Sequence, residues 1–142
     1  MSLDCLNNEN APHATGYLLL FRNTGWDGQV PADQIQQAIA KVNAWFEGLS
    51  ASGKLVAAQP LLDETVVISG KGGGAVTDGP FSEAKEVIGG YVLLSTTSLE
   101  EAIEIAKGNP MHEYGLTTEV RATASGCPHI YRALNQLAEA AV

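Results

Sequence analysis

A rigid turn that carries an acidic side chain is the most distinctive candidate for chemistry in the sequence. It consists of Asp78, Gly79 and Pro80. The aspartate can bond to its own downstream backbone, the glycine permits a positive φ, and the proline fixes the next φ. Such a turn has a structural role first. A carboxylate held rigidly at the mouth of a cleft is also suited to act as a general base or to anchor a ligand.

His112 and Ser82 are two further candidates. His112 lies between a predicted helix and the last predicted strand, where a histidine is more often a solvated or hydrogen-bonded structural residue. It can work with Asp78 only if the fold brings the two together. Ser82 and Lys85 have the S-x-x-K spacing of serine acylases, but a four-residue match arises by chance and a charge-paired turn accounts for it equally well. We retain Ser82 as a candidate for ligand binding.

Arg22 and Tyr91 complete the candidate site. Arg22 ends an apolar run, where it can pair with an anionic substrate, and Tyr91 can line an apolar pocket, although core or interface packing is the ordinary role of such a ring. With Asp78 and His112 as acid and base, the predicted chemistry is proton transfer by an isomerase, a lyase or a hydrolase. It requires no cofactor. Cys127 has no second ligand pair at metal-binding spacing, so we predict no metal site.

The elements that must position these side chains repeat one pattern. Apolar runs and alternation predict strands, and helical periodicity predicts helices, in the order strand, helix, strand, strand, helix, strand, helix. The strands are expected at 15–22, within 87–96 and at 115–124, with two short strand-like pieces at 54–58 and 65–68 in the place of the second strand. The helices are expected from Pro31 to Gly53, from Leu99 to Ala106 and over about 128–141, and Ser98 with Glu101 forms a capping-box signature before the second helix. Residues 70–74 are glycine-rich but lack the phosphate-loop motif, so they predict a hairpin loop.

This order is the split βαβ arrangement of ferredoxin-like folds, so the expected class is α+β with an antiparallel sheet and both main helices on one face. Residues Ile35, Ala38, Ile39, Val42, Phe46 and Leu49 form the expected buried stripe of the first helix. The other face of the sheet must also be covered. Pairing of two copies is the simplest cover, so we predict a homodimer.

Length and charge exclude several classes of function. The 142 residues predict one domain over 15–142, preceded by a flexible tail over 1–14. Eight basic against 16 acidic residues give a net charge of −8, which repels phosphate backbones and anionic lipids. The sequence has neither an apolar run of about 20 residues nor a secretory leader. We expect a cytoplasmic protein that contacts neither nucleic acid nor membrane.

The string VTDGPFSEAKEVIGGYVLL, followed by SLEEAIEIAKGNP and YGLTTEVRAT, resembles the DGPF branch of the YCII-related family over residues 15–124. The resemblance implies a ferredoxin-like subunit of a dimeric α+β barrel, a bacterial origin and a largely unassigned role. Better-studied relatives are thought to place a histidine of the first helix and an aspartate in a pocket. The first helix here has no histidine. Val42 or Asn43 stands where the histidine of those relatives would fall.

Two hypotheses about function therefore remain. The first is a small-molecule enzyme or ligand-binding protein with a pocket near Asp78, Arg22 and His112. The second follows from the resemblance, because members of the family are often fused to, or encoded beside, extracytoplasmic-function sigma factors: a non-enzymatic module that binds a sigma factor or another protein. A closed pocket with a titratable group of displaced pKa favours the first, and an exposed apolar patch beyond the dimer face favours the second.

Overall fold

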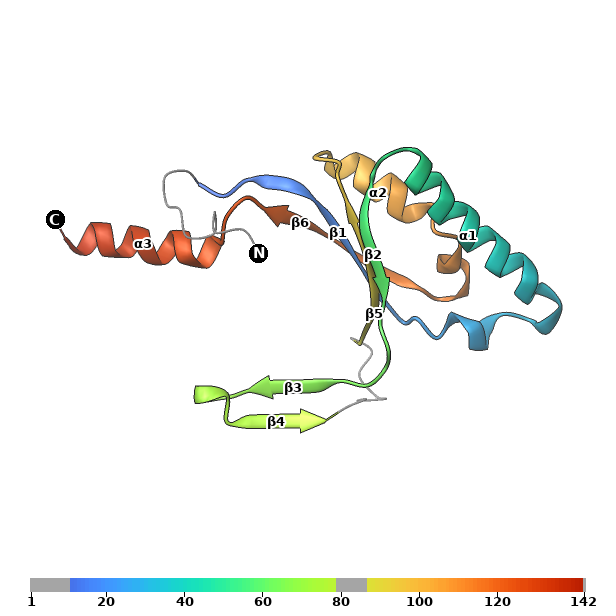
Figure 1. Cartoon of the computed structure of the whole chain (residues 1–142), viewed down its shortest axis with the longest axis horizontal. Coiled ribbons are helices and arrows are strands. Elements are labelled where there is room, and N and C mark those ends of the chain that lie inside the picture. The colour runs from blue at the N-terminus through green and yellow to red at the C-terminus, as the bar shows by residue number, and fades with distance from the viewer. Residues whose placement is uncertain (1–10, 79–86, 142) are drawn as a thin grey trace.

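The computed structural model describes residues 11–78 and 87–141, so most of the predicted tail and the segment 79–86 lie outside it (Figure 1). Its elements alternate strands and helices, with short 3₁₀ turns between them. They are β1 (Ala14–Arg22), η2 (Trp26–Gln29), η3 (Ala32–Gln34), α1 (Ile35–Ala51), β2 (Leu55–Pro60), β3 (Val66–Ser69), η4 (Lys71–Gly73), β4 (Ala75–Asp78), β5 (Ile88–Leu94), α2 (Leu99–Lys107), η5 (Pro110–Tyr114), β6 (Thr117–Ala124) and α3 (Pro128–Ala140).

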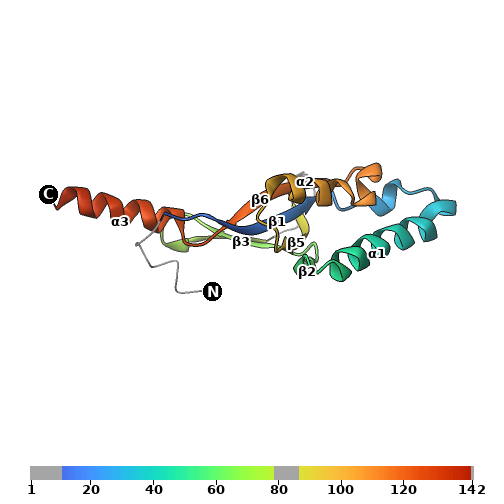
Figure 2. The ribbon, with the colours of Figure 1, turned by 90° about the horizontal axis from the view of Figure 1, so that it is seen from above.

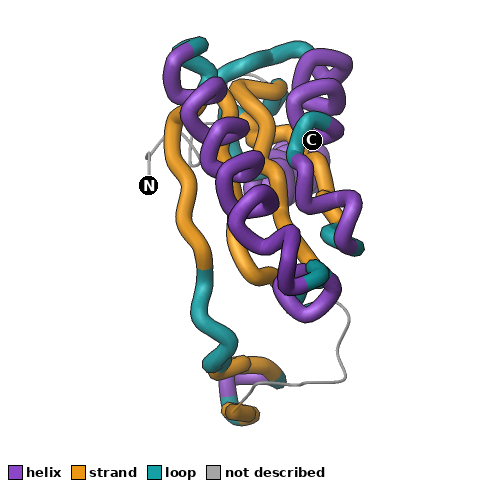
Figure 3. The backbone as a smooth tube through the Cα atoms, turned by 90° about the vertical axis from the view of Figure 1, so that its right-hand side faces the viewer, coloured by secondary structure: helices purple, strands orange, loops and turns teal. Residues whose placement is uncertain are grey.

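A four-stranded antiparallel sheet forms the centre of the molecule. Its strand order is β2-β5-β1-β6, which is the order of the ferredoxin-like split βαβ fold. Helices α1 and α2 lie together on one face of this sheet (Figure 3). The predicted α+β class is therefore confirmed. The sheet of one copy is open, with β2 and β6 at its edges, so a barrel would require strands from a second copy.

The strand register separates the two faces of the sheet. Leu19 of β1 lies between Val92 and Val120, and this row faces the helices, with Leu19 and Val92 fully buried. The next row, Leu20 between Tyr91 and Glu119, faces the opposite side, as successive residues of a strand must. No described helix covers this second face, and the side chains on it are half-buried.

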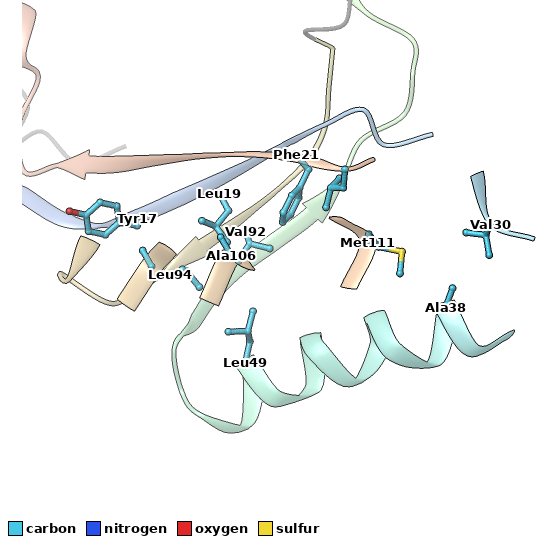
Figure 4. Packing of buried hydrophobic residues seen from close by; sticks show 12 residues of the cluster. Tyr17, Leu19, Phe21, Val30, Ala38, Leu49, Val92, Leu94, Ala106 and Met111 are labelled. Atoms are coloured by element: carbon cyan, nitrogen blue, oxygen red, sulfur yellow. The ribbon is translucent and has the colours of Figure 1, made fainter. Parts of the chain in front are cut away.

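The core lies between the first face and the helices. Figure 4 shows Leu19, Val92 and Leu94 of the sheet opposite Leu49 of α1. Trp45 closes the core at one end, where its indole Nε1 donates a hydrogen bond to the carbonyl oxygen of Ile105, 3.2 Å away.

The two main helices differ in detail from the prediction. The α-helix expected from Pro31 begins at Ile35, because η3 occupies the intervening residues. Its buried stripe is also narrower than expected: Ala38 and Leu49 are buried, whereas Ile35 and Ile39 are exposed.

The first turn of α2 uses half of the predicted capping box. The hydroxyl of Ser98 accepts a hydrogen bond from the Glu101 N–H at 3.2 Å, as an N-cap should. The carboxylate of Glu101 contacts Lys54 instead of returning to the Ser98 N–H, which donates to the hydroxyl of Thr96. The pattern located the helix start correctly, and a distant lysine changed the partner of the glutamate.

Strands β3 and β4 form a separate hairpin that stands away from the four-stranded sheet (Figures 1 and 3). Its turn contains Gly70, Gly72 and Gly73 at positive φ, which is why the glycine-rich stretch is needed there. Apolar side chains on both strands are exposed, with Ile68 as much as 68% exposed. A two-stranded hairpin is marginally stable alone in water, so this one needs a surface to pack on.

Helix α3 is the predicted C-terminal helix, and it extends beyond the end of the sheet (Figures 1 and 2). None of its residues is fully buried, and Leu137 on it is exposed. No helix within residues 11–78 and 87–141 has the length and hydropathy that crossing a membrane requires.

Candidate ligand pocket

A pocket of about 470 Å³ opens between α1 and the helix-facing side of the sheet. This volume is in the range of small-molecule sites. Figure 4 shows Phe21 and Met111 on the side of the sheet that faces α1. The described lining residues come from β1, α1, β2, β5, η5 and the loops beside them: Phe21, Thr24, Trp26, Val42, Phe46, Ala58, Gln59, Pro60, Leu61, Asp63, Gly89, Gly90, Tyr91, Asn109, Met111 and Leu116.

Two glycines keep the pocket wall thin. Gly90 is in the helix-facing row of β5, opposite Phe21, and a Cβ there would lie 3.2 Å from the backbone oxygen of Gln59. A Cβ on Gly89 would overlap the side chain of Thr24. The sequence Gly89-Gly90 therefore leaves space where ordinary side chains would enter the wall or the cavity.

Asn109 is the buried polar residue of the lining. It is 4% exposed and caps η5, with its Oδ1 accepting a hydrogen bond from the Met111 N–H at 3.0 Å. The Met111 N–H needs an oxygen as acceptor, which fixes the orientation of the amide. The Nδ2 group donates to no residue in the described part of the chain. Asn109 lines the pocket, so its amide can meet water or a ligand there.

Asp63 contributes a carboxylate to the lining. It lies in the segment between β2 and β3 and is exposed, as expected at the mouth of a pocket. The described lining residues include no lysine, arginine or histidine. The lining thus combines apolar walls with the amide residues Gln59 and Asn109 and one carboxylate, that of Asp63.

His112 lies outside this pocket and has structural partners. Its Nδ1 is 3.0 Å from the carbonyl oxygen of Asn109, and its Nε2 is 2.8 Å from the hydroxyl of Thr118. A carbonyl only accepts, so Nδ1 carries a proton and donates to it, whereas the Thr118 hydroxyl can either donate to Nε2 or accept from it. His112 therefore joins η5 to β6 and steadies the backbone of Asn109. It borders a separate hollow beside α2.

Arg22 lies on the opposite side of the sheet from the pocket. It shares the helix-free face with Glu119, and its guanidinium is 3.6 Å from that carboxylate. Its Nε is buried without a hydrogen-bond partner among the residues described. Glu119 also lies 3.9 Å from Arg121. The three side chains form a charged group at the β6 edge.

Asp78 is the last residue of β4, where it is exposed and pairs with Val66 in the hairpin. Ser82 lies outside the described residues. Of the predicted site residues, Tyr91 borders the pocket, although its place in the Leu20 row directs its side chain to the helix-free face. Asp78, Arg22 and His112 occupy three different places outside the lining. Their roles in acid–base chemistry and anion binding stay predictions.

Sequence reasoning missed Asn109 and Asp63. In the sequence, the pair Asn109-Pro110 is typical of the end of a helix, but an asparagine before a proline is equally a cap for a following turn. Asp63 carries no comparable signal, because its place at the pocket depends on the path of the chain between two strands.

Among the described residues, the group with a displaced pKa belongs to a structural ion pair. Lys54 Nζ lies 2.6 Å from Glu101 Oε1, and this contact lowers the pKa of the glutamate carboxyl. Both residues lie outside the pocket lining. Within residues 11–78 and 87–141, no three His, Cys, Asp or Glu side chains are grouped so as to hold a metal ion.

Comparison with known families assigns the chain to one of them. A model of the YCII-related domain matches residues 17–125, which is more than half of the chain. The protein therefore belongs to the YCII-related family. A search of curated proteins found no match.

Proposed function

We propose that this YCII-related protein binds a small organic molecule in the pocket between α1 and the sheet. The observation that carries this proposal is the amide of Asn109 in the pocket lining, whose Oδ1 accepts from Met111 while its Nδ2 donates to no described residue. Nδ2 can therefore donate to an acceptor of a ligand. The aromatic and aliphatic walls supply the apolar surface that small-molecule sites ordinarily have.

Binding is what the pocket supports, and no particular reaction follows from it. The proton-transfer chemistry expected of Asp78 and His112 needs both groups at one substrate, and in a single copy neither lines the pocket. Membership of the DGPF branch and a cytoplasmic location likewise stay predictions from the sequence.

A pocket-filling variant tests the site. Ala58 lines the pocket from β2, and Ala58→Phe should fill it. Val56 is on the same strand, is exposed and does not line the pocket, so Val56→Phe is the matched control. In a thermal-shift screen of metabolites, compounds that raise the melting temperature of the wild type and of Val56→Phe should not stabilise Ala58→Phe. A folded Ala58→Phe protein that keeps these shifts would place the binding site elsewhere.

We also propose that two copies associate through the helix-free face of the sheet. Leu18, Leu20 and Leu93 form an apolar centre on this face, and the exposed hairpin offers further apolar surface. Association of two copies would cover the leucine centre and the hairpin. Closed two-fold pairing is the commonest arrangement of such dimers. It would also place the Arg22–Glu119 pair at an interface.

The oligomeric state tests this assembly. Light scattering after size-exclusion chromatography should give the mass of two chains for the wild type and for Ala44→Arg, which alters an exposed position of α1. Leu20→Arg should give one chain, because it places a charge in the proposed contact. A wild-type protein that is monomeric at all concentrations would contradict the dimer. It would favour the alternative of an interaction module for a sigma factor or another protein, since the exposed hairpin would then need a different partner.

A further inference from the structure

The polar groups of the pocket also specify the class of molecule that fits it. This step rests on the proposed function. We infer that the ligand is a neutral or cationic compound with an apolar, ring-sized body, a hydrogen-bond acceptor at the end that meets Asn109, and a hydrogen-bond donor or amine at the end that meets Asp63.

The acceptor is required by the way Asn109 is held. Its Oδ1 accepts from Met111 N at 3.0 Å, and its backbone oxygen lies 3.0 Å from Nδ1 and 3.3 Å from the amide nitrogen of His112. These bonds fix both the backbone and the amide plane. The Nδ2 group is then the part left for the cavity, and it can only donate. A carbonyl or an unprotonated ring nitrogen matches it, whereas an ammonium group does not.

The body of the ligand is set by the walls. Phe21, Trp26 and Phe46 contribute three aromatic rings, and Val42, Met111 and Leu116 add aliphatic surface. Aromatic walls favour a flat ring by stacking and edge contacts. A long polar chain, such as a sugar or a peptide, would leave many of its groups without partners there.

The charge of the ligand is set by Asp63 and by the surroundings. Asp63 is the charged residue of the described lining, and it is negative. The whole chain carries a net charge of −8, so the long-range field also attracts cations and repels anions. A carboxylate or phosphate ligand would meet repulsion without a basic partner from the residues described. This preference is opposite to the anionic substrate expected from Arg22, whose guanidinium contacts Glu119 on the other face.

Four probes built on one ring separate these requirements. 3-(Aminomethyl)benzamide has both the acceptor and the amine, 3-methylbenzamide has the acceptor alone, 3-methylbenzylamine has the amine alone, and 3-carbamoylbenzoate has the acceptor with a negative charge. We expect the first to bind most tightly in calorimetric or NMR titrations of the full chain. We expect the anion to bind most weakly, about tenfold or more below the amine-bearing amide.

Two conservative variants assign each end of the ligand. Asn109→Asp keeps an oxygen for the Met111 N–H but removes the donor, so it should weaken both neutral and cationic benzamides about tenfold. Asp63→Asn should weaken only the amine-bearing probes. Glu64→Gln, at an exposed neighbour that does not line the pocket, should change none of the affinities. Circular dichroism of each variant checks that it is folded.

The outcomes separate this inference from the proposed function. If the anionic probe binds as well as the amine, or if no probe binds at millimolar concentration, the ligand class is wrong. The pocket itself then stands or falls by the metabolite screen with Ala58→Phe. If the probes bind in the expected order but Asn109→Asp and Asp63→Asn leave that order unchanged, the assignment of the two ends is overturned.

Discussion

The ammonium nitrogen of Lys54 lies 2.6 Å from Oε1 of Glu101, and this contact joins the start of β2 to the first turn of α2. It connects the two βαβ halves of the fold outside the core. Because Lys54 lowers the pKa of Glu101, the glutamate binds a proton less readily in the folded chain than in the unfolded chain. The contact therefore stabilises the fold at pH values above the ordinary glutamate pKa and ceases to do so as the pH falls through the lowered pKa.

We predict that Lys54→Met lowers the melting temperature slightly at neutral pH and that the difference from the wild type shrinks in acid. The effect is small because both side chains are more than a third exposed. Lys107→Met is the control, since Lys107 and Glu104 form a longer and more exposed pair whose loss should not be measurable. Thermal unfolding followed across a pH series decides this. A difference that grows as the pH falls would contradict the assigned pairing.

Removal of the N-cap of α2 should destabilise the protein. Ser98→Ala deletes the hydroxyl that accepts from the Glu101 N–H, and we expect a loss of about 1 kcal/mol in the free energy of unfolding. Thr97→Ala, at the exposed residue before the cap, should change stability by less than about 0.5 kcal/mol. Urea denaturation of both variants provides the comparison, and equal effects would show that the cap is not the cause.

Gly16 is required by a close approach of two strands. A Cβ at this buried position would lie 2.6 Å from the backbone oxygen of Leu94, which cannot move without disturbing the ladder of β1 and β5. Gly16→Ala should therefore cost about 1–3 kcal/mol of stability. Gly25→Ala meets no atom within 4 Å and should be close to neutral. Denaturant midpoints of the two variants test the contrast, which disappears if the strands can separate freely.

Substitutions at the centre of the core should lower the stability far more than substitutions in the connecting segments. Leu19 is fully buried in the middle of the sheet, and Leu19→Ala should destabilise by about 2–5 kcal/mol through lost transfer energy and a residual cavity. Leu62 is 85% exposed, so Leu62→Ala should change stability by less than about 0.5 kcal/mol. If calorimetry finds the same loss of stability for Leu19→Ala and Leu62→Ala, the assignment of Leu19 to the core is wrong.

The fold was predictable because its signals are local. Alternation and continuous apolar runs located β1, β2, β3, β5 and β6 but not β4, and the Ser98 signature located the start of α2. The separation of β3 and β4 from the main sheet was not predictable, because sheet membership depends on contacts between distant segments. The first helix was also expected to bury Ile39, which is exposed.

The site was less predictable than the fold. Tyr91 borders the pocket, and its role in ligand binding stays a prediction. The acid and base candidates were chosen by side-chain type, and type does not show which face of a sheet or which element a residue will share with others. His112 has both ring nitrogens occupied by structural partners. Asn109 could be found only from burial, because its significance lies in a donor that lacks a partner.

The segment between β2 and β5 begins and ends at one point of the sheet. Leu61 N–H donates a hydrogen bond to the oxygen of Gly89 at 2.9 Å, and Pro60 pairs with Gly90 in the ladder, so the two ends of the insertion are already joined. A segment anchored in this way can be lengthened or shortened at low cost, because loop closure depends only weakly on length. Asp63 belongs to this segment, whereas the aromatic walls of the pocket belong to the elements outside it. Replacing the segment between β2 and β5 can therefore change the charge that selects a ligand. The aromatic walls that contact the body of the ligand would stay the same.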